Sequence, residues 1–317
     1  MSAIVGAAAV VRVARVAAAA VAARAARRRL AAALRPALIA AAFAVAAPAQ
    51  LLTTDAGVLS PALIAARETF EWQHRAGADD LRATTRAAWS PDRRLQFEAG
   101  VPWITRDVDA ATAQGIAQGS MSGLGDLEFG AKWALVRDDA VMRSERLSLL
   151  GNVRLPTGDD DGRVGGVDLG RRAALGLGVY GVGAGVGWTT VRDRHRAAAA
   201  LRGWTYTEDG GFAPGEAVTF DAAWWMRLHP VRFEPGVHRN ELRSVVELIS
   251  GWQQEDRLGG VGQDDGGFYA KALVGLQANA TAATSIEAGV LLPLVDDTKS
   301  ALGDFRVGVL VTFRVFF

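Results

Sequence analysis

The chain has 317 residues, of which 50% are hydrophobic, with 36 glycines, nine tryptophans, no cysteine and a formal net charge of +1. Residues 1–49 contain seven arginines and no acid, so the rest of the chain has 28 basic and 34 acidic residues and a net charge of −6. This balance argues against nucleic acid as a partner, and the lack of cysteine excludes a disulfide framework.

The N-terminal end predicts export from the cytoplasm. Arginines cluster within residues 27–35, an apolar run follows over residues 36–47, and Ala47-Pro48-Ala49 has the small-x-small pattern that a signal peptidase cleaves. We expect residues 1–49 to be an extended N-terminal region with a signal peptide, and the mature chain to begin near Gln50. The apolar run is shorter than the roughly 20 residues of a membrane-spanning helix.

The mature chain is expected to begin with a short segment before the main domain. Residues 50–67 contain several large apolar side chains and predict a short periplasmic segment or a plug for a barrel mouth. The outer-membrane β-barrel itself is expected over residues 68–317.

From residue 69 onward, segments of alternating apolar and polar residues are separated by polar breaks. This period of two is typical of strands with one face in lipid, and most segments reach the roughly 9–11 residues that a tilted membrane strand needs. The pattern predicts an all-β fold, a transmembrane antiparallel β-barrel of 12 strands, with 14 as the alternative because bacterial single-chain barrels have even strand counts. The segments are 69–75, 81–89, 94–104, 125–136, 146–155, 172–191, 197–207, 217–228, 241–252, 268–279, 285–294 and 305–317.

One of these segments changes its parity. Within residues 172–191 the apolar positions Leu175 and Val179 are odd, whereas Val182 and Val186 are even, and the change falls near Gly181. A β-bulge in one long strand would produce this pattern. A tight turn that creates an extra strand would do so as well, which is the reason for the alternative count.

The breaks alternate in charge along the chain. Arg-rich breaks, such as residues 192–196, are expected in the periplasm, and acid-rich breaks at the cell surface. Surface acids could attract divalent cations that bridge lipopolysaccharide phosphates, so outer-membrane lipid and lipopolysaccharide are expected partners, although solvated loops explain the acids more simply. No break has the spaced oxygen ligands of a dedicated metal site, and no metal or cofactor is expected. The acid-rich breaks contain Asp79 and Asp80, Asp107 and Asp109, residues 159–161, 208–209, 264–265 and 296–297.

Charged residues of both signs share the parity opposite to the apolar face. They are expected to line the barrel lumen and to pair with one another, since an unpaired charge in a confined interior is costly. Such a network could line a narrow channel or close it. The predicted lumen-lining residues are Arg82, Arg86, Arg94, Glu98, Asp126, Glu128, Lys132, Arg154, Asp221, Arg227, Arg243, Glu247, Lys271, Glu287, Arg306 and Arg314.

The stretch from Gly123 to Arg163 contains residues that carry a family resemblance: Gly125-Asp126, Gly130, Lys132-Trp133 and Leu155-Pro156-Thr157-Gly158. On these residues the chain resembles the outer-membrane family associated with the meta-pathway of phenol degradation, whose members are described as transporters. The resemblance implies a barrel in the bacterial outer membrane that acts as a channel or transporter for small molecules, including aromatic or hydrophobic compounds. Pro156 can end a strand and Gly158 can permit the following turn.

The last thirteen residues form the clearest strand pattern. Every second residue from Phe305 to Phe317 is apolar, and Arg306 and Arg314 fall on the other face. This resembles the last strand of an outer-membrane barrel, and the resemblance implies that the barrel-assembly machinery is a partner. The assembly signal is expected at Phe313, Val315 and Phe317.

Two other functions remain open. A structural or lipid-interacting barrel without transport would have the same strand pattern. A barrel lipid hydrolase would need a serine and a histidine near the outer rim; His74 lies near Asp79 and Asp80, but no serine is singled out, and the common hydrolase motifs are absent. We therefore do not expect an enzyme.

Overall fold

The structure is a computed structural model that describes residues 63–112, 115–140, 143–231, 240–281, 283–300 and 302–317. The predicted signal peptide lies outside the described residues, as does most of the segment 50–67. The first strand begins at Ile64, so the last residues of that segment belong to the barrel wall. Among the described residues no helix is long and apolar enough to cross a membrane.

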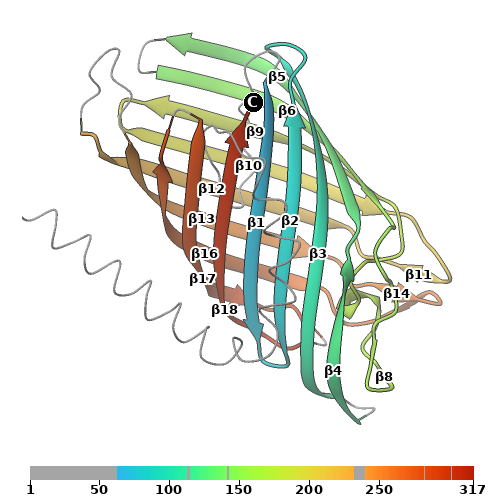
Figure 1. The fold of residues 1–317 in the computed structure, drawn as a ribbon. Coiled ribbons are helices and arrows are strands. Elements are labelled where there is room, and N and C mark those ends of the chain that lie inside the picture. The colour runs from blue at the N-terminus through green and yellow to red at the C-terminus, as the bar shows by residue number, and fades with distance from the viewer. Residues whose placement is uncertain (1–62, 113–114, 141–142, 232–239, 282, 301) are drawn as a thin grey trace, which may run out of the picture. The chain divides into compact units, whose positions relative to one another are not determined.

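The wall is a closed antiparallel sheet with twelve strand positions (Figure 1). Each wall strand pairs with its neighbours in the chain, and β1 pairs with β18, which closes the sheet. The prediction of a 12-strand barrel is confirmed. The wall strands are β1 (Ile64–Arg75), β2 (Ala78–Trp89), β3 (Leu95–Thr112), β4 (Gly115–Leu124) together with β5 (Leu127–Ala140), β6 (Arg143–Leu155), β9 (Gly181–Arg192), β10 (His195–Tyr206), β12 (Ala217–His229), β13 (Glu241–Gln253), β16 (Gly267–Asn279), β17 (Thr284–Asp296) and β18 (Phe305–Phe316).

Strands β4 and β5 share one position because Gly125 and Asp126 interrupt the strand between them. β3 pairs with β5 near its start and with β4 near its end, and β4 also contacts the small β7–β8 hairpin. The remaining elements are short and lie in the connections between wall strands: β7 (Arg163–Val164), β8 (Val167–Asp168), the 3-10 helix η1 (Arg171–Ala173), β11 (Phe212–Ala213), β14 (Arg257–Leu258) and β15 (Val261–Gly262).

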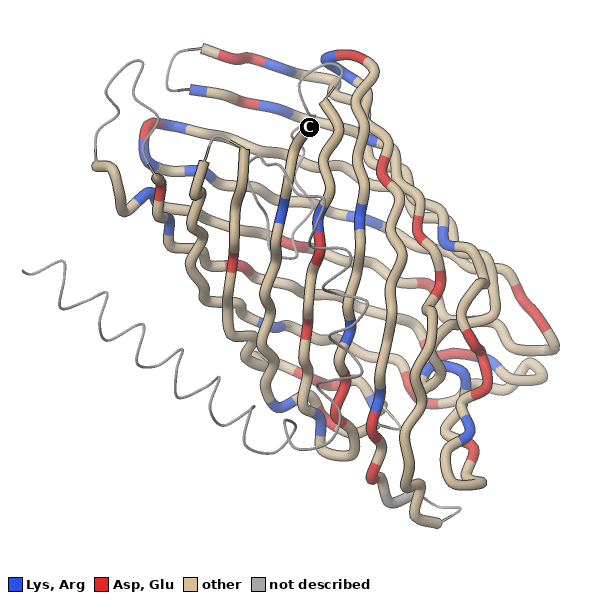
Figure 2. The backbone as a smooth tube through the Cα atoms, in the orientation of Figure 1, with Lys and Arg blue, Asp and Glu red and all other residues tan. Residues whose placement is uncertain are grey.

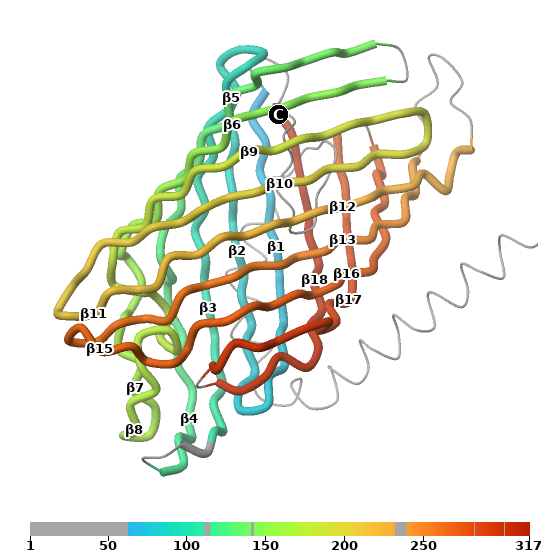
Figure 3. The backbone as a smooth tube through the Cα atoms, turned by 180° about the vertical axis from the view of Figure 1, so that it is seen from behind, coloured from blue at the N-terminus to red at the C-terminus, as the bar shows by residue number. Residues whose placement is uncertain are grey.

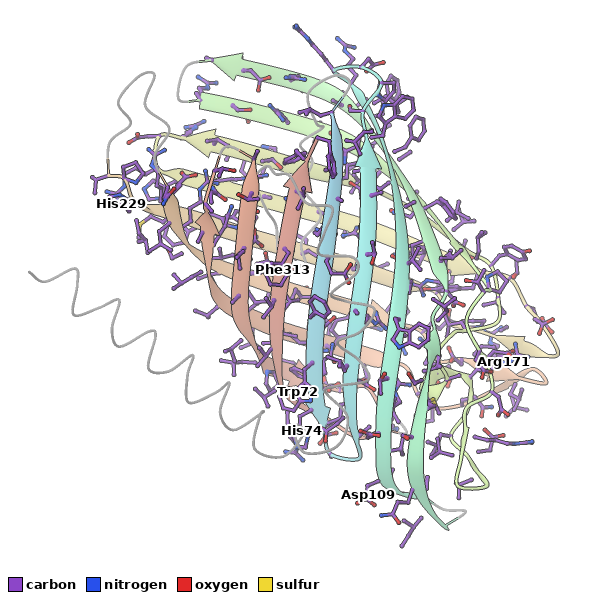
Figure 4. The ribbon with its side chains drawn as sticks, in the orientation of Figure 1. Trp72, His74, Asp109, Arg171, His229 and Phe313 are labelled. Atoms are coloured by element: carbon purple, nitrogen blue, oxygen red, sulfur yellow. The ribbon has the colours of Figure 1, made fainter. Side chains whose placement is uncertain are left out.

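The two ends of the barrel differ (Figure 3). One end, named here the loop end, has the long connections 156–180, 207–216, 254–266 and 297–304. The other, the turn end, has the turns at 90–94, 193–194 and 280–283 and both ends of the sheet, Ile64 and Phe316. Figure 4 shows Asp109 and Arg171 at the loop end and His229 at the opposite end. All predicted acid-rich breaks fall at the loop end.

Most outward-facing side chains of the wall are apolar, as a lipid-facing surface requires. Trp89 and Phe97 stack near the turn end, with ring centroids 6.1 Å apart, while Trp252 and Phe268 are cross-strand partners nearer the loop end. Exposed aromatic rings at both levels form the girdles typical of outer-membrane barrels. The exposed aromatic side chains of the wall include Trp89, Phe97, Trp103, Phe129, Trp133, Trp188, Phe220, Trp224, Trp252, Phe268 and Phe313.

Two expectations about strands need correction. The segment 172–191 is not one strand: β9 begins at Gly181, and the residues before it form part of a loop in which Leu175 and Val179 are buried. The change of parity therefore marks the junction between loop and strand. Arg94, expected in the lumen, lies exposed in the turn between β2 and β3, because the chain does not rejoin the sheet until Leu95.

A β-bulge changes the faces at the start of β18. His74 pairs with Val307 and Arg75 pairs with Phe305, so Arg306 has no cross-strand partner on β1. Phe305 consequently points inward and is only 2% exposed, whereas Arg306 is exposed, 3.7 Å from Asp304. The expectation that Arg306 lines the lumen is therefore wrong.

The topology predicts which end reaches the cell surface. An epitope inserted at Asp160, in the loop 156–180, is expected to be accessible to antibody on intact cells. One inserted at Asp193, in the turn between β9 and β10, is expected to become accessible only after the outer membrane is permeabilised. Labelling of Asp193 alone on intact cells would mean that the barrel has the opposite orientation.

The sheet closure predicts a role for the last residue. The backbone N–H of Phe317 donates a hydrogen bond of 2.8 Å to the carbonyl of Ile64 and extends the β1–β18 seam. Deletion of Phe317 removes this bond and the terminal aromatic ring, and should leave little folded barrel in the outer membrane. The measurement is heat-modifiable mobility of membrane fractions on gels, with Phe317→Tyr as the control that keeps the ring. A normal level of folded barrel after deletion would contradict the assembly signal.

Candidate functional site

A cavity of about 1410 Å³ lies at the loop end and is named here the vestibule. Its wall consists of inward-facing side chains of β1, β2, β10, β12, β13, β16 and β17, and its rim consists of loop residues on η1 and near β11 and β14. The strand connections thus place loop residues over the barrel interior. Figure 2 shows acidic and basic residues close together in these loops.

Arg172 of η1 joins three of the rim loops. Its Nε donates to Asp256 at 2.6 Å, and its guanidinium lies 3.6 Å from Asp265. Asp256 is 1% exposed on its side chain and also accepts a 2.8 Å hydrogen bond from the backbone N–H of Gly215. Burial raises the pKa of the Asp265 carboxyl in this cluster. Ion pairs of this kind, held away from water on one side, fix the loops relative to one another.

The neighbouring Arg171 binds further surface acids. Its guanidinium lies 3.0 Å from Asp209 and 3.2 Å from Asp160, and over the ring of Phe212. Lys299 similarly pairs with Asp264 at 2.6 Å. These acids therefore bind basic residues of the chain, and the described residues contain no group of three or more His, Asp or Glu side chains placed to hold a metal ion.

Asp126, at the interruption between β4 and β5, anchors the loop 156–180. Its carboxylate accepts hydrogen bonds from the backbone N–H of Gly158 at 3.1 Å and of Leu177 at 2.8 Å. The hydroxyl of Thr157 accepts a 2.9 Å bond from Leu127 N–H. A Cβ at Gly158 would lie 2.8 Å from the Cα of Gly176, so only glycine fits there. The motifs Gly125-Asp126 and Leu155-Pro156-Thr157-Gly158 therefore bind each other and hold this loop to the wall. We name this set of hydrogen bonds the latch.

Below the vestibule, the lumen wall formed by β2, β3, β5 and β6 is charged. Glu128 accepts hydrogen bonds of 2.8 Å from both Arg86 and Arg154, and Lys132 pairs with Glu98 at 2.6 Å. Each acid is thus bound by at least one base, as the cost of an unpaired interior charge requires. Arg106 and Asp80 form another such pair at 2.5 Å nearer the loop end.

Next to this charged wall, β9 presents glycine to the interior. Gly181, Gly183 and Gly185 face inward because their cross-strand partners on β6 and β10 do. Trp204 pairs with Gly183, where an added Cβ would lie 2.9 Å from the indole ring. The missing side chains make room for Trp204, whose ring lies 5.3 Å from the guanidinium carbon of Arg154.

The opposite part of the lumen wall, on β10, β12, β13, β16, β17 and β18, mixes charged side chains such as Glu247, Glu287 and Arg314 with apolar ones. The apolar inward-facing side chains form one buried cluster, with Ile249 packed against it. The cluster consists of Ala198, Ala223, Trp225, Val245, Leu273, Leu291, Phe305 and Leu310. The interior therefore combines ion pairs on β2 to β6 with an apolar cluster that lies among charged residues on β10 to β18.

The sequence matches a known protein family. The sequence model of the family described as "Putative MetA-pathway of phenol degradation" matches residues 58–277, more than half of the chain. The chain belongs to this family. No curated protein sequence matches it.

The solved structures support the fold. An outer membrane channel from Pseudomonas putida F1 aligns with a TM-score of 0.64 and 14% identity, over 84% of this chain and 100% of that chain. LpxR from Salmonella typhimurium aligns with a TM-score of 0.43 and 10% identity, over 81% of this chain and 100% of that chain. The closed barrel and its lipid-facing girdles place this family member in the bacterial outer membrane.

The structure places thirteen of the sixteen predicted lumen residues on the inner face; Arg94 and Arg306 are exposed elsewhere, and Asp126 lies between β4 and β5 and binds the loop 156–180. Arg202 and Asp221, 2.9 Å apart, add a pair of which the sequence predicted only the acid. The inner-face residues are Arg82, Arg86, Glu98, Glu128, Lys132, Arg154, Asp221, Arg227, Arg243, Glu247, Lys271, Glu287 and Arg314.

Sequence reasoning missed the aromatic and loop residues of this site. Trp204 and Tyr206 of β10 share the inner parity, which an inspection of β10 alone could have revealed. Arg171 and Arg172 could not be found in this way, because their partners lie in loops far along the chain. The inward position of Phe305 depends on the bulge in β18.

The predicted assembly residues lie at or near the β1–β18 seam. Phe313 is exposed on the outer face and contacts Phe70 edge to face, with centroids 6.4 Å apart. Val315 is buried and Phe317 is exposed. Whether the assembly machinery reads them stays a prediction.

The hydrolase alternative rests on His74, on the outer face near the loop end (Figure 4). Its Nδ1 lies 2.9 Å from the Asp79 carboxylate, and its ring stacks on Trp72. Within the described part of the chain, no serine hydroxyl is hydrogen-bonded to His74, so a complete Ser-His-Asp arrangement is not formed.

The latch at Asp126 makes a prediction about the vestibule. Asp126→Ala removes two charge-assisted hydrogen bonds and should cost about 2–4 kcal/mol locally. The loop 156–180 should then become sensitive to added protease on intact cells, while the barrel remains heat-modifiable. Asp109→Ala, an exposed acid of β3 at the loop end, is the control, and equal protease sensitivity in the two variants would argue against the latch.

Proposed function

We propose that this outer-membrane barrel is a channel for small molecules, and that its solutes include compounds with an aromatic or otherwise hydrophobic body. The observation that carries the proposal is the mixed lumen wall, with paired charges on β2 to β6 and an apolar cluster on β10 to β18. A solute with an apolar body and a polar group can contact charged and apolar surface at once. Sites that bind small organic molecules have the same combination of apolar surface and few polar groups.

The vestibule supports the proposal at the loop end. Inward-facing Trp204 and Tyr269 line it together with Arg202 and Asp221, so aromatic and polar groups meet there as well. The family's description refers to phenol degradation, and the aligned protein from Pseudomonas putida F1 is named an outer membrane channel. Both are in keeping with passage of small organic compounds.

A structural or lipid-interacting barrel without transport is the second candidate. The bound pairs Lys132–Glu98 and Arg86–Glu128–Arg154 favour it, because interlocked charges can hold a barrel closed as well as line a pore. In both cases lipopolysaccharide and the assembly machinery are the proposed partners of the wall. Measurement of conductance separates the two functions.

The charged wall predicts how an open channel selects ions. Arg154→Ala removes one of the two bases bound to Glu128 and leaves the lumen more negative, so selectivity should shift toward cations. The measurement is the reversal potential of the purified protein in planar bilayers under a salt gradient. Val153→Ala is the matched control, since Val153 is the neighbouring residue on the lipid face and never meets the solute.

Two outcomes would count against the channel. A parent protein that folds but gives no conductance would favour the structural alternative. Equal reversal potentials for the Arg154 and Val153 variants would mean that the charged wall does not line the path of the ions.

A further inference from the structure

The sequence contains three lysines, and the structure gives them different surroundings. Lys132 pairs with Glu98 and Lys299 pairs with Asp264, both at 2.6 Å. Lys271 faces the vestibule from β16 and has no carboxylate within 4.0 Å among the described residues. Its Nζ instead lies 4.1 Å from the ring centroid of Phe305 and 5.8 Å from that of Tyr269. Ring faces attract a cation, but they leave it free to bind an anion.

The acids nearest to Lys271 are bound elsewhere. Glu71 accepts a 2.5 Å hydrogen bond from the amide of Gln73. Asp296, at the end of the neighbouring strand, accepts bonds from the Thr298 hydroxyl at 2.5 Å and from Phe305 N–H at 3.0 Å. Asp80 and Asp221, which also lie on the inner wall, pair with Arg106 and Arg202. The ammonium of Lys271 is therefore a vestibule cation that can receive an anion from outside the chain, and the ring faces beside it distinguish it from the arginines of the cavity.

Apolar side chains adjoin this ammonium on the same wall. Ile249 is the cross-strand partner of Lys271, and Leu291 of β17 belongs to the buried apolar cluster on the other side. Both side chains line the vestibule together with Tyr269, whose ring fits over Gly251 because an added Cβ there would lie 2.7 Å from the ring. A ligand bound to Lys271 would thus place its remaining atoms against apolar and aromatic surface.

We propose that the floor of the vestibule is a binding site for a small aromatic carboxylate, with Lys271 as the counter-ion of its carboxylate. The ring of the ligand packs against Ile249, Leu291 and Tyr269. This inference rests on the proposed channel function, for which it specifies a site and a solute class. A purely inorganic anion leaves the apolar surface uncovered, and a neutral aromatic compound leaves the ammonium without a partner. An aromatic carboxylate covers the apolar surface with its ring and pairs its charge with the ammonium.

The test is binding of benzoate to the protein purified from outer membranes, measured by titration calorimetry in detergent. The parent should bind benzoate, should bind benzyl alcohol more weakly because it has no charge, and should not measurably bind acetate, which has no ring. Lys271→Met should weaken benzoate binding by about tenfold or more, as the loss of one charge-assisted contact predicts, and should leave benzyl alcohol binding unchanged. Lys271→Arg should retain most of the affinity.

Lys299→Met is the matched control, because Lys299 lines the same cavity but is already paired with Asp264. Its benzoate affinity should equal that of the parent, and heat-modifiable mobility on gels verifies that each variant is folded. The proposal is overturned if folded parent does not bind benzoate, if Lys271→Met binds it as well as the parent, or if Lys299→Met loses as much affinity. It is also overturned if acetate binds as tightly as benzoate.

Conductance separates failure of this site from failure of the channel. If the parent conducts in bilayers but does not bind benzoate, the proposed channel function stands and the proposed site is overturned. If the parent binds benzoate through Lys271 but does not conduct, the proposed site stands and the channel function is overturned.

Discussion

Closure of the backbone hydrogen-bond ladder is the constraint on which the rest of this structure depends. Lipid offers no hydrogen-bond partner to an N–H or a carbonyl, so a spanning sheet has to leave no open edge. The chain meets this requirement where β1 pairs with β18, down to the reciprocal bonds between Ile64 and Phe317. Once the sheet is closed, the period of two divides every strand into one face for lipid and one for the lumen.

The two faces follow different rules. The lipid face is mostly apolar because hydrocarbon penalises polar side chains, and the exceptions on it include Glu68, which is hydrogen-bonded to Thr85, and His74 near the loop end. The inner face carries charges, and many of them form pairs such as Lys132 and Glu98. It also presents Trp225, Leu273 and other apolar residues in one cluster. A barrel that served only as a membrane anchor would not need this combination in its interior, which is the feature most closely connected with transport.

The loop end adds a second level of organisation. Asp126 holds one long loop to the wall, and Arg172 binds that loop to a second one through Asp256, which also accepts a hydrogen bond from Gly215 of a third. Arg171 and Arg172 also pair with Asp160, Asp209 and Asp265, which the sequence alone would assign to solvated surface or to divalent cations. The loops therefore shape the vestibule, and within it Lys271 is left facing ring surfaces and the cavity.

The sequence by itself determined the all-β class and the lipid-facing parity of most wall strands, and it predicted twelve strands with fourteen as the alternative, because each follows from local composition and a period of two. It also located most of the inner charges. It did not determine that Trp225 faces the lumen, since the run Ala222-Ala223-Trp224-Trp225-Met226 is apolar at both parities. The bulge at Arg306, the loop pairs of Arg172 and the free ammonium of Lys271 were decided only by the tertiary structure. Each depends on residues that come together when the sheet closes, and no local pattern encodes such contacts.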